Sequence, residues 1–209
     1  MATKIYECIQ KIGDAIIENK DFLTDLDREI GDADHGVNMA RGFTEVLAQL
    51  PQDETDLGKV LKKVGMVLLS KVGGASGPLY GTAYMKAAGP VNGKTELTLE
   101  DGKEMLEAVI AGIKMRGKAE RGEKTMLDAL EPALEALTKG LENGDDAQAC
   151  LNAMCEAARE GVEYTKTIRA TKGRASYLGD RSIGHQDPGA TSSAITLEAI
   201  KEFYVENFK

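Results

Sequence analysis

The stretch LDALEPALEALTKGLEN, residues 127–143, decides the fold class of this chain. Its leucines recur three or four residues apart, at Leu127, Leu130, Leu134, Leu137 and Leu141. This spacing places them along one face of an α-helix. An apolar stripe that narrow does not support an isolated helix, so the helix must pack against other helices.

Seven further stretches show apolar residues at helical spacing. They cover residues 5–20, 39–50, 57–68, 78–89, 99–113, 150–168 and 188–208. No segment shows the period-two alternation that is typical of a half-buried β-strand. We therefore predict an all-α fold of about eight helices with short connections, formed as one domain over residues 1–209.

The composition limits the class of protein. Apolar residues make up 42% of the chain and aromatic residues only 5%, a balance that favours helices. No apolar run is long enough to span a membrane, and the first residues lack a secretion signal. The three cysteines, Cys8, Cys150 and Cys155, show no zinc-ligand pattern, which indicates reduced thiols in a cytoplasmic protein. The net charge of −8 argues against nucleic acid as a partner.

Three aspartates lie close together in LDREIGDADHGVNMARGF, residues 26–43. In the simplest interpretation Asp27 caps nothing in particular, while Asp32 and Asp34 serve the turn and the N-terminus of the next helix. Two caps do not need three carboxylates, whereas a divalent cation needs clustered oxygen ligands. The calcium-loop template fails at its glycine and final glutamate positions, so we favour Mg²⁺ bound together with nucleotide phosphates.

Two glycine-rich segments supply groups that can contact phosphate. In KVGGASGPLYGTAY, residues 71–84, free backbone N–H groups can meet an anion at the start of a helix, although such a segment can also be a simple connection. In GRASYLGDRSIGHQDPGATS, residues 173–192, Arg174 supplies charge-assisted donors, unless it is a solvated loop cation. Asp187 before Pro188 is typical of an ordinary helix N-cap.

The residues alone leave the roles of several side chains open. His35 and His185, the two histidines, lie in loops rich in glycine and aspartate, where each could be a phosphoryl carrier, a general base or a ligand donor. Met126 ends RGKAERGEKTM, residues 116–126, where it could fill the core or face a purine ring. No serine or cysteine lies in a nucleophile elbow, which argues against covalent acyl chemistry.

In this order and spacing, GDADHGVNM, VGGASGPLYGT, RGKAERGEKTM and GRASYLGDRSIGHQDPGATS closely resemble the nucleotide-binding L subunits of bacterial phosphoenolpyruvate-dependent dihydroxyacetone kinases. The resemblance covers essentially the whole chain. It implies a barrel of eight antiparallel amphipathic helices with the nucleotide at one end. It also implies that Asp27, Asp32 and Asp34 hold two Mg²⁺ ions, which bridge the phosphates of ADP or ATP. Nucleotide contacts are implied for His35, Gly36, Val37, Asn38, Ala75, Ser76, Gly117, Met126, Arg174, Asp187, Pro188 and Gly189.

The resemblance implies partners as well. An L subunit keeps ADP tightly bound, the phosphohistidine of an M subunit of the phosphotransferase system recharges it to ATP, and a K subunit holds dihydroxyacetone as the acceptor. No catalytic residue is then expected here beyond the metal and phosphate ligands. Two alternatives stay open: a subunit of an ATP-dependent kinase that exchanges ATP freely, and a regulatory module whose nucleotide state a transcription factor reads.

Overall fold

The described residues of this computed structural model, 3–208, form nine α-helices and one 3-10 helix and contain no strand. The predicted all-α fold is therefore confirmed. None of these helices has the length and apolar character that a bilayer span requires. The helices are α1 Lys4–Glu18, α2 Lys20–Ile30, α3 His35–Gln49, α4 Leu57–Lys71, α5 Ser76–Ala87, α6 Leu99–Gly117, α7 Leu127–Asn143, α8 Ala147–Thr165, the 3-10 helix η1 Arg174–Ser182 and α9 Pro188–Asn207.

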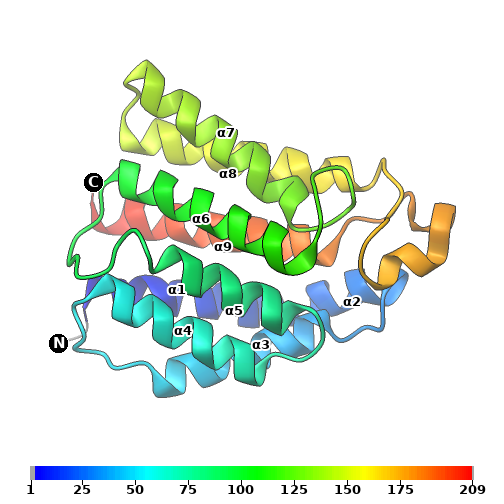
Figure 1. Ribbon diagram of the computed structural model, residues 1–209, viewed down its shortest axis with the longest axis horizontal. Coiled ribbons are helices and arrows are strands. Elements are labelled where there is room, and N and C mark those ends of the chain that lie inside the picture. The colour runs from blue at the N-terminus through cyan, green and yellow to red at the C-terminus, as the bar shows by residue number, and fades with distance from the viewer. Residues whose placement is uncertain (1–2, 209) are drawn as a thin grey trace.

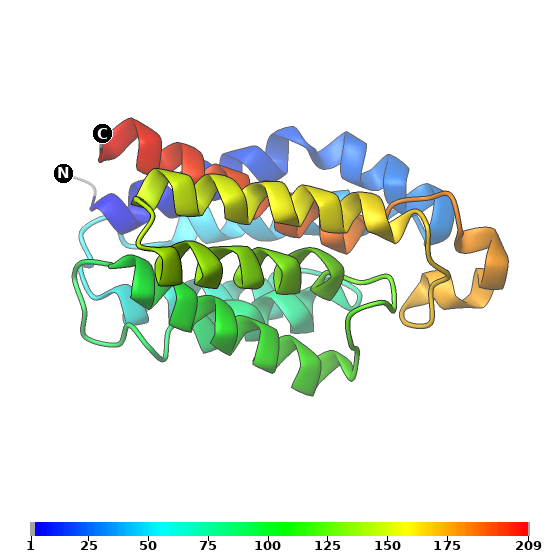
Figure 2. The same ribbon diagram turned by 90° about the horizontal axis from the view of Figure 1, so that it is seen from above.

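The α-helices close into a ring (Figures 1 and 2). From α3 to α9, each helix packs against the next one along the chain, and α1 contacts both α3 and α9. Because α1 and α2 are separated by Asn19 alone, they act as one broken member, and the ring has the eight antiparallel members that the resemblance implies. Apolar faces from all members meet inside the ring, where Phe43 and Tyr84 are in edge-to-face contact.

The apolar spacing predicts one first helix that ends near Lys20, and it does not predict the separate helix α2. In the structure α1 ends at Glu18, and α2 begins directly after Asn19, whose side chain donates a hydrogen bond to the Ala15 carbonyl. The buried face of α2 includes Leu23, Asp27 and Ile30. Since a carboxylate occupies the middle of that stripe, the apolar repeat that would have revealed the helix is interrupted.

Alternating helix direction sorts the helix ends into two groups. The N-termini of α3, α5, α7 and α9 lie at the right of Figure 1, together with the connections 31–34, 72–75, 118–126 and 166–187. Each helix N-terminus carries a partial positive charge from its unpaired N–H groups. At the opposite end α1 begins and α9 ends, where the Lys4 ammonium donates to the Asn207 side chain at 2.6 Å. The C-termini of α2, α4, α6 and α8 lie at the same end, so an anion site there depends on N-terminal N–H groups that stay unpaired.

Candidate functional site

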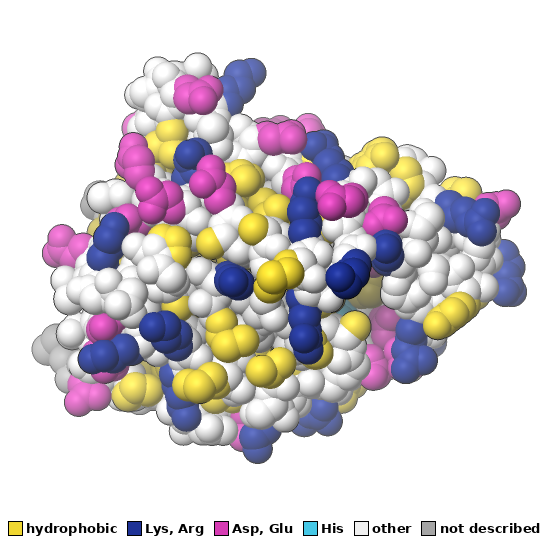
Figure 3. Space-filling model, viewed as in Figure 1, with side chains coloured by type: hydrophobic (Ala, Val, Ile, Leu, Met, Phe, Trp, Pro, Cys, Tyr) yellow, Lys and Arg dark blue, Asp and Glu magenta, His cyan; other side chains and the backbone are white. Residues whose placement is uncertain are grey.

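A cavity of about 480 Å³ opens at the end where the four helix N-termini converge. This volume lies within the range of small-molecule sites. Lys and Arg side chains border the hollow to the right of centre in Figure 3. Twelve of the fifteen predicted site residues line the cavity: Asp27, Asp32, Asp34, His35, Ala75, Ser76, Gly117, Met126, Arg174, Asp187, Pro188 and Gly189. The other three, Gly36, Val37 and Asn38, follow His35 in the first turn of α3 but do not line the cavity.

The three predicted metal ligands form one cluster. Asp27 comes from the buried face of α2, while Asp32 and Asp34 come from the bend that follows, and one carboxylate oxygen of each lies within 4.8 Å of the others. Burial, and then the neighbouring Asp32 carboxylate, raise the pKa of Asp34. Arg174 of η1 reaches across the cavity to Asp32, with 2.8 Å between nitrogen and oxygen. Among the described residues it is the only Lys or Arg in an ion pair with the cluster.

Asp27 has a second role that the sequence did not reveal. Its Oδ2 accepts hydrogen bonds from the backbone N–H groups of Asp34, at 2.8 Å, and His35, at 3.1 Å. It therefore caps the N-terminus of α3, a role that the simplest reading of the sequence gave to Asp32 or Asp34. The bend passes tightly around this carboxylate, since a Cβ on Gly31 would lie 2.0 Å from Asp27 Oδ1. A side chain at Gly31 would displace the cluster.

The composition of the cluster fits a hard divalent cation. Three carboxylates face a single guanidinium, so the cluster lacks positive charge, and oxygen atoms are the ligands that Mg²⁺ prefers. Asp27 Oδ1 accepts no hydrogen bond from any described residue and stays free to bind a cation. Three protein oxygens leave an octahedral ion with open positions, which phosphate oxygens and water can fill.

The glycine-rich connection between α4 and α5 faces the same cluster. Gly74 has φ +64°, a left-handed conformation that favours glycine. A Cβ added to it would lie 3.9 Å from Asp34 Oδ2. No side chain caps the N-terminus of α5, which begins at Ser76. Pro78 has no N–H and the Leu79 N–H donates to the Ala75 carbonyl, so the N–H groups of Ser76 and Gly77 are the ones available to an anion beside the carboxylates.

His35 is buried between two hydroxyl groups. Its Nδ1 lies 2.9 Å from Ser76 Oγ, and its Nε2 lies 2.9 Å from Ser192 Oγ on α9, which in turn lies 2.6 Å from the Tyr80 hydroxyl. Burial lowers the pKa of His35 to about 4, so the imidazole is neutral at pH 7. Both ring nitrogens are occupied and shielded from solvent. This arrangement argues against the phosphoryl-carrier role that the sequence left open for His35.

His185 lies elsewhere. Its Nδ1 is 3.7 Å from Glu29 Oε2, it is partly exposed, and it does not line the cavity. The structure therefore separates the two histidines, and only His35 lies against the carboxylate cluster.

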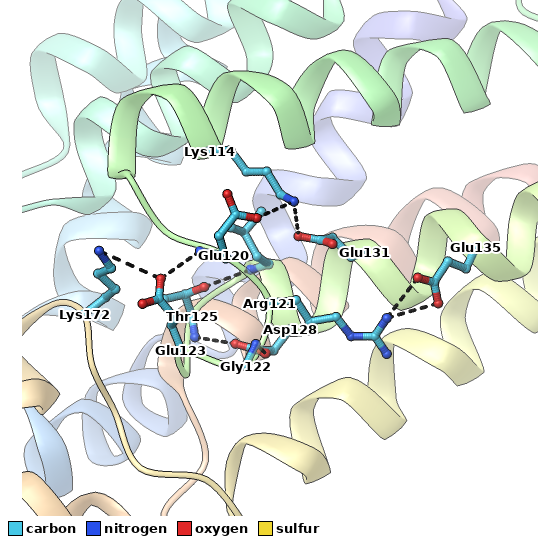
Figure 4. A network of polar contacts seen from close by, with 11 residues as sticks. Lys114, Glu120, Arg121, Gly122, Glu123, Thr125, Asp128, Glu131, Glu135 and Lys172 are labelled. Carbon is cyan, nitrogen blue, oxygen red and sulfur yellow. Dashed lines mark hydrogen bonds and ion pairs between the residues drawn. The ribbon is translucent and has the colours of Figure 1, made fainter.

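The segment 118–126 forms one wall of the cavity and ends in Met126, which is 5% exposed. Ion pairs and hydrogen bonds hold this segment in place (Figure 4). The Asp128 carboxylate accepts from the backbone N–H groups of Gly122 and Thr125, and the Glu123 carboxylate accepts from Thr171 Oγ1 at 3.0 Å. These contacts join the segment to α7 on one side and to the residues before η1 on the other.

Asp187 and Gly189 form the facing wall. Asp187 caps α9, because its Oδ2 accepts from the Ala190 N–H at 2.7 Å, as the sequence predicted for an N-cap. Burial raises the pKa of Asp187 to about 7, and the hydrogen bond from Ala190 acts in the opposite direction. The position of a Cβ on Gly189 lies 3.8 Å from Met126, so the two walls approach closely. Met126 and Gly189 thus adjoin each other at one side of the cavity.

Several residues of the site were not predicted. Lys124 lines the cavity although its side chain is only 1% exposed, and Tyr80 and Ser192 complete the hydrogen-bond chain of His35. Lys124 and Ser192 fall inside motifs that the sequence singled out, but burial of a lysine in a charged loop has no signature in sequence. Tyr80 lies in the helix predicted after the glycine cluster, where an aromatic side chain is equally consistent with a core position.

The comparisons with known proteins agree with one another on the family. Residues 29–202 match the family described as DAK2 domain. The ADP-binding subunit DhaL of the PEP-dependent dihydroxyacetone kinase of Escherichia coli (strain K12) is 46% identical over 199 residues, covering 95% of each chain. The ADP-binding subunit DhaL of the PTS-dependent dihydroxyacetone kinase of Lactococcus lactis is 42% identical over 197 residues, covering 94% of each chain.

A solved structure shares the fold. The dihydroxyacetone kinase from C. freundii in complex with AMP-PNP and Mg²⁺ superposes with a TM-score of 0.69 at 27% sequence identity. The match covers 95% of this chain and 33% of that one, so a domain like this one forms about a third of a larger kinase.

Proposed function

The chain belongs to the DAK2 domain family, and on that premise we propose that it is the ADP-binding subunit of a phosphoenolpyruvate-dependent dihydroxyacetone kinase. In this role a phosphoryl group received from a phosphohistidine of an M subunit passes through the bound nucleotide to dihydroxyacetone on a K subunit. The relatives named as ADP-binding subunits align with nearly the whole of this chain, which supports a separate subunit of the same kind.

One observation carries this proposal: three carboxylates and an uncapped helix N-terminus face each other across one cavity. The carboxylates of Asp27, Asp32 and Asp34 offer oxygen ligands to Mg²⁺, and the first turn of α5 offers N–H groups to phosphate. The carboxylates lack a cation and the N–H groups lack an acceptor, and a ligand that contains both divalent cations and an anion satisfies both needs. Magnesium bound to a nucleoside diphosphate has this composition.

The residues of this chain have distinct tasks in the proposed reaction. Phosphoryl transfer depends mainly on position and on neutralisation of the charge on the moving group, which bound Mg²⁺ supplies. Asp27 orients the α3 N-terminus and offers one free oxygen, while Arg174 presents a guanidinium beside Asp32 at the cavity wall. Met126 and Gly189, which adjoin each other in the cavity lining, offer a surface for the base. No general base is needed here, because the acceptor hydroxyl would be activated on the partner.

Native mass spectrometry of the purified protein tests this proposal. We expect a mass increase equal to one adenine nucleotide with two Mg²⁺ ions, and we expect it to survive desalting. A protein that carries no nucleotide and does not bind Mg–ADP when it is added would contradict the proposal.

An activity assay with purified K subunit then identifies the phosphoryl donor. We expect dihydroxyacetone phosphate to form with phosphoenolpyruvate and its phosphocarrier proteins, and we expect no sustained turnover with free ATP alone, because the bound ADP does not exchange. Equal sustained rates with ATP would instead assign the chain to an ATP-exchanging kinase.

A further inference from the structure

Lys124 is a buried lysine beside the cavity that the proposed function does not use. Its side chain is 1% exposed, and its backbone has φ +62°, a left-handed conformation that is uncommon outside glycine. Such a conformation persists only where surrounding contacts hold it in place. The contacts of the side chain therefore identify what the residue does.

The ammonium of Lys124 is held by backbone carbonyl groups from two other segments. Nζ donates to the carbonyl oxygens of Thr165, the last residue of α8, and His185, and it lies 3.5 Å from the carbonyl oxygen of Ile168. We call these three carbonyls the carbonyl cage. An ammonium has three N–H donors, so the cage uses all of them and leaves none for a phosphate. Lys124 is thus not a phosphate ligand.

The position of the carbonyl cage is favourable for a positive charge. The carbonyl of Thr165 belongs to the C-terminus of α8, where the helix dipole is negative. Burial lowers the pKa of Lys124, while the Asp187 and Asp128 carboxylates act in the opposite direction. A neutral side chain of the same length would leave buried carbonyl groups without donors, which is costly.

Lys124 also connects the two walls of the cavity. It lies two residues before Met126, and through the His185 carbonyl it holds the chain two residues before Asp187. Thr165 adds a second connection, because its Oγ1 accepts from the Asp187 N–H at 2.9 Å. The Lys124 ammonium and its acceptors therefore tie the Met126 wall directly to the Asp187–Gly189 wall.

We propose that Lys124 is a positioning residue: its ammonium, held in the carbonyl cage, fixes the Met126 wall against the Asp187–Gly189 wall, both of which line the cavity proposed to hold the nucleotide. The consequence for nucleotide affinity rests on the proposed function, whereas the connection between the walls does not. Loss of the ammonium should loosen residues 118–126 and 183–190 together, although they are distant in sequence.

The test compares Lys124→Met with Lys118→Met, which removes an exposed ammonium from the same segment. Hydrogen–deuterium exchange of the nucleotide-free proteins reports the two walls, and calorimetry reports the dissociation constant of Mg–ADP. We expect Lys124→Met to exchange faster in both 118–126 and 183–190 and to bind Mg–ADP about tenfold more weakly or worse, the effect of one unpaired buried carbonyl. Lys118→Met should match the wild type in both measurements.

Two further variants separate positioning from general stability. Leu137→Ala, a core change further along α7, should lower the melting temperature and leave the Mg–ADP affinity of the folded protein unchanged. Lys124→Arg, which keeps the charge, should restore part of the affinity and protection. If Lys124→Met does not fold, the same two measurements on Lys124→Arg decide the question.

Wild-type exchange in 183–190 together with wild-type affinity in the Lys124 variant would overturn the proposal. If the wild-type protein itself fails to bind Mg–ADP, the proposed function is wrong, and the exchange data still decide whether Lys124 connects the walls.

Discussion

Single side chains at this site carry more than one task each. Asp27 caps a helix and presents a free oxygen to the cavity, and Asp187 caps another helix while it forms a wall. Ala33, between two of the clustered carboxylates, has φ +59°, which costs a residue other than glycine about 1–2 kcal/mol. The bend is thus held in a strained form that brings the carboxylates together, and function and stability compete at this point.

Asp32→Asn should weaken the binding of Mg–ADP by at least about tenfold, since even outer-shell partners of a metal are worth about 10–100-fold in affinity. Binding of ADP in the presence of EDTA should not change, because the carboxylate acts through the cation. Calorimetry with and without Mg²⁺ checks this, with the exposed Asp25→Asn on α2 as the matched control. Unchanged Mg²⁺-dependent affinity would mean that the cluster serves only the local backbone.

Asp187→Asn should remove a pH dependence of stability. The folded-state pKa of Asp187, raised by burial to about 7, exceeds its unfolded value, so protonation favours the folded state. Its contribution to stability is fully present below about pH 4 and is lost as the pH rises through 7. Relative to the variant, the nucleotide-free wild type should therefore gain stability between pH 7.5 and pH 5.

Urea midpoints of both proteins at these two pH values check this prediction. Asparagine can still accept the N–H of Ala190, so the cap is kept. Midpoints that shift in parallel in the two proteins would show that Asp187 titrates normally.

At the scale of the helices, apolar spacing predicted the α-helices except α2. The leucine stripe of α7 is confirmed, but α2 was missed because Asp27 interrupts its buried face. The cavity residues could be named from motifs, yet the connection of Lys124 to the end of α8 depends on long-range packing, which no local pattern encodes. The expected contacts between the fifteen named residues and the nucleotide and metal remain predictions.

Close approach of α7 and α8 depends on Gly161. A Cβ at this position would lie 2.0 Å from the Asp128 carbonyl oxygen, so Gly161→Ala must push the two helices apart and should cost about 3 kcal/mol. Gly102→Ala on α6 meets nothing within 4 Å and should instead stabilise the protein by about 0.5–1 kcal/mol. Urea denaturation of both variants checks the opposite signs, and a neutral Gly161→Ala would contradict the helix packing described here.

For the whole molecule, the arrangement of helix ends links ligand binding to folding. The cavity takes groups from α2 to α9, so a ligand bound there would hold the ring closed. Above the dissociation constant, each tenfold increase in Mg–ADP should add about 1.4 kcal/mol of stability. For a chain of this size the melting temperature should then rise by about 3–6 °C per tenfold increase.

Thermal unfolding over a Mg–ADP concentration series checks this expectation, and EDTA should abolish most of the shift. A melting temperature that does not depend on ligand concentration would show that the ligand does not bind the folded ring preferentially.

The meeting of α1 and α9 at the end away from the cavity has a practical consequence. Because Lys4 and Asn207 touch there, a short peptide linker could join the start of α1 to the end of α9 without crossing the mouth of the cavity. New ends could then be opened in the exposed α7–α8 turn at Gly144, which lies on the same side. Such a circular permutant should keep its ligand, so the order of the helices along the chain matters less than their order around the ring.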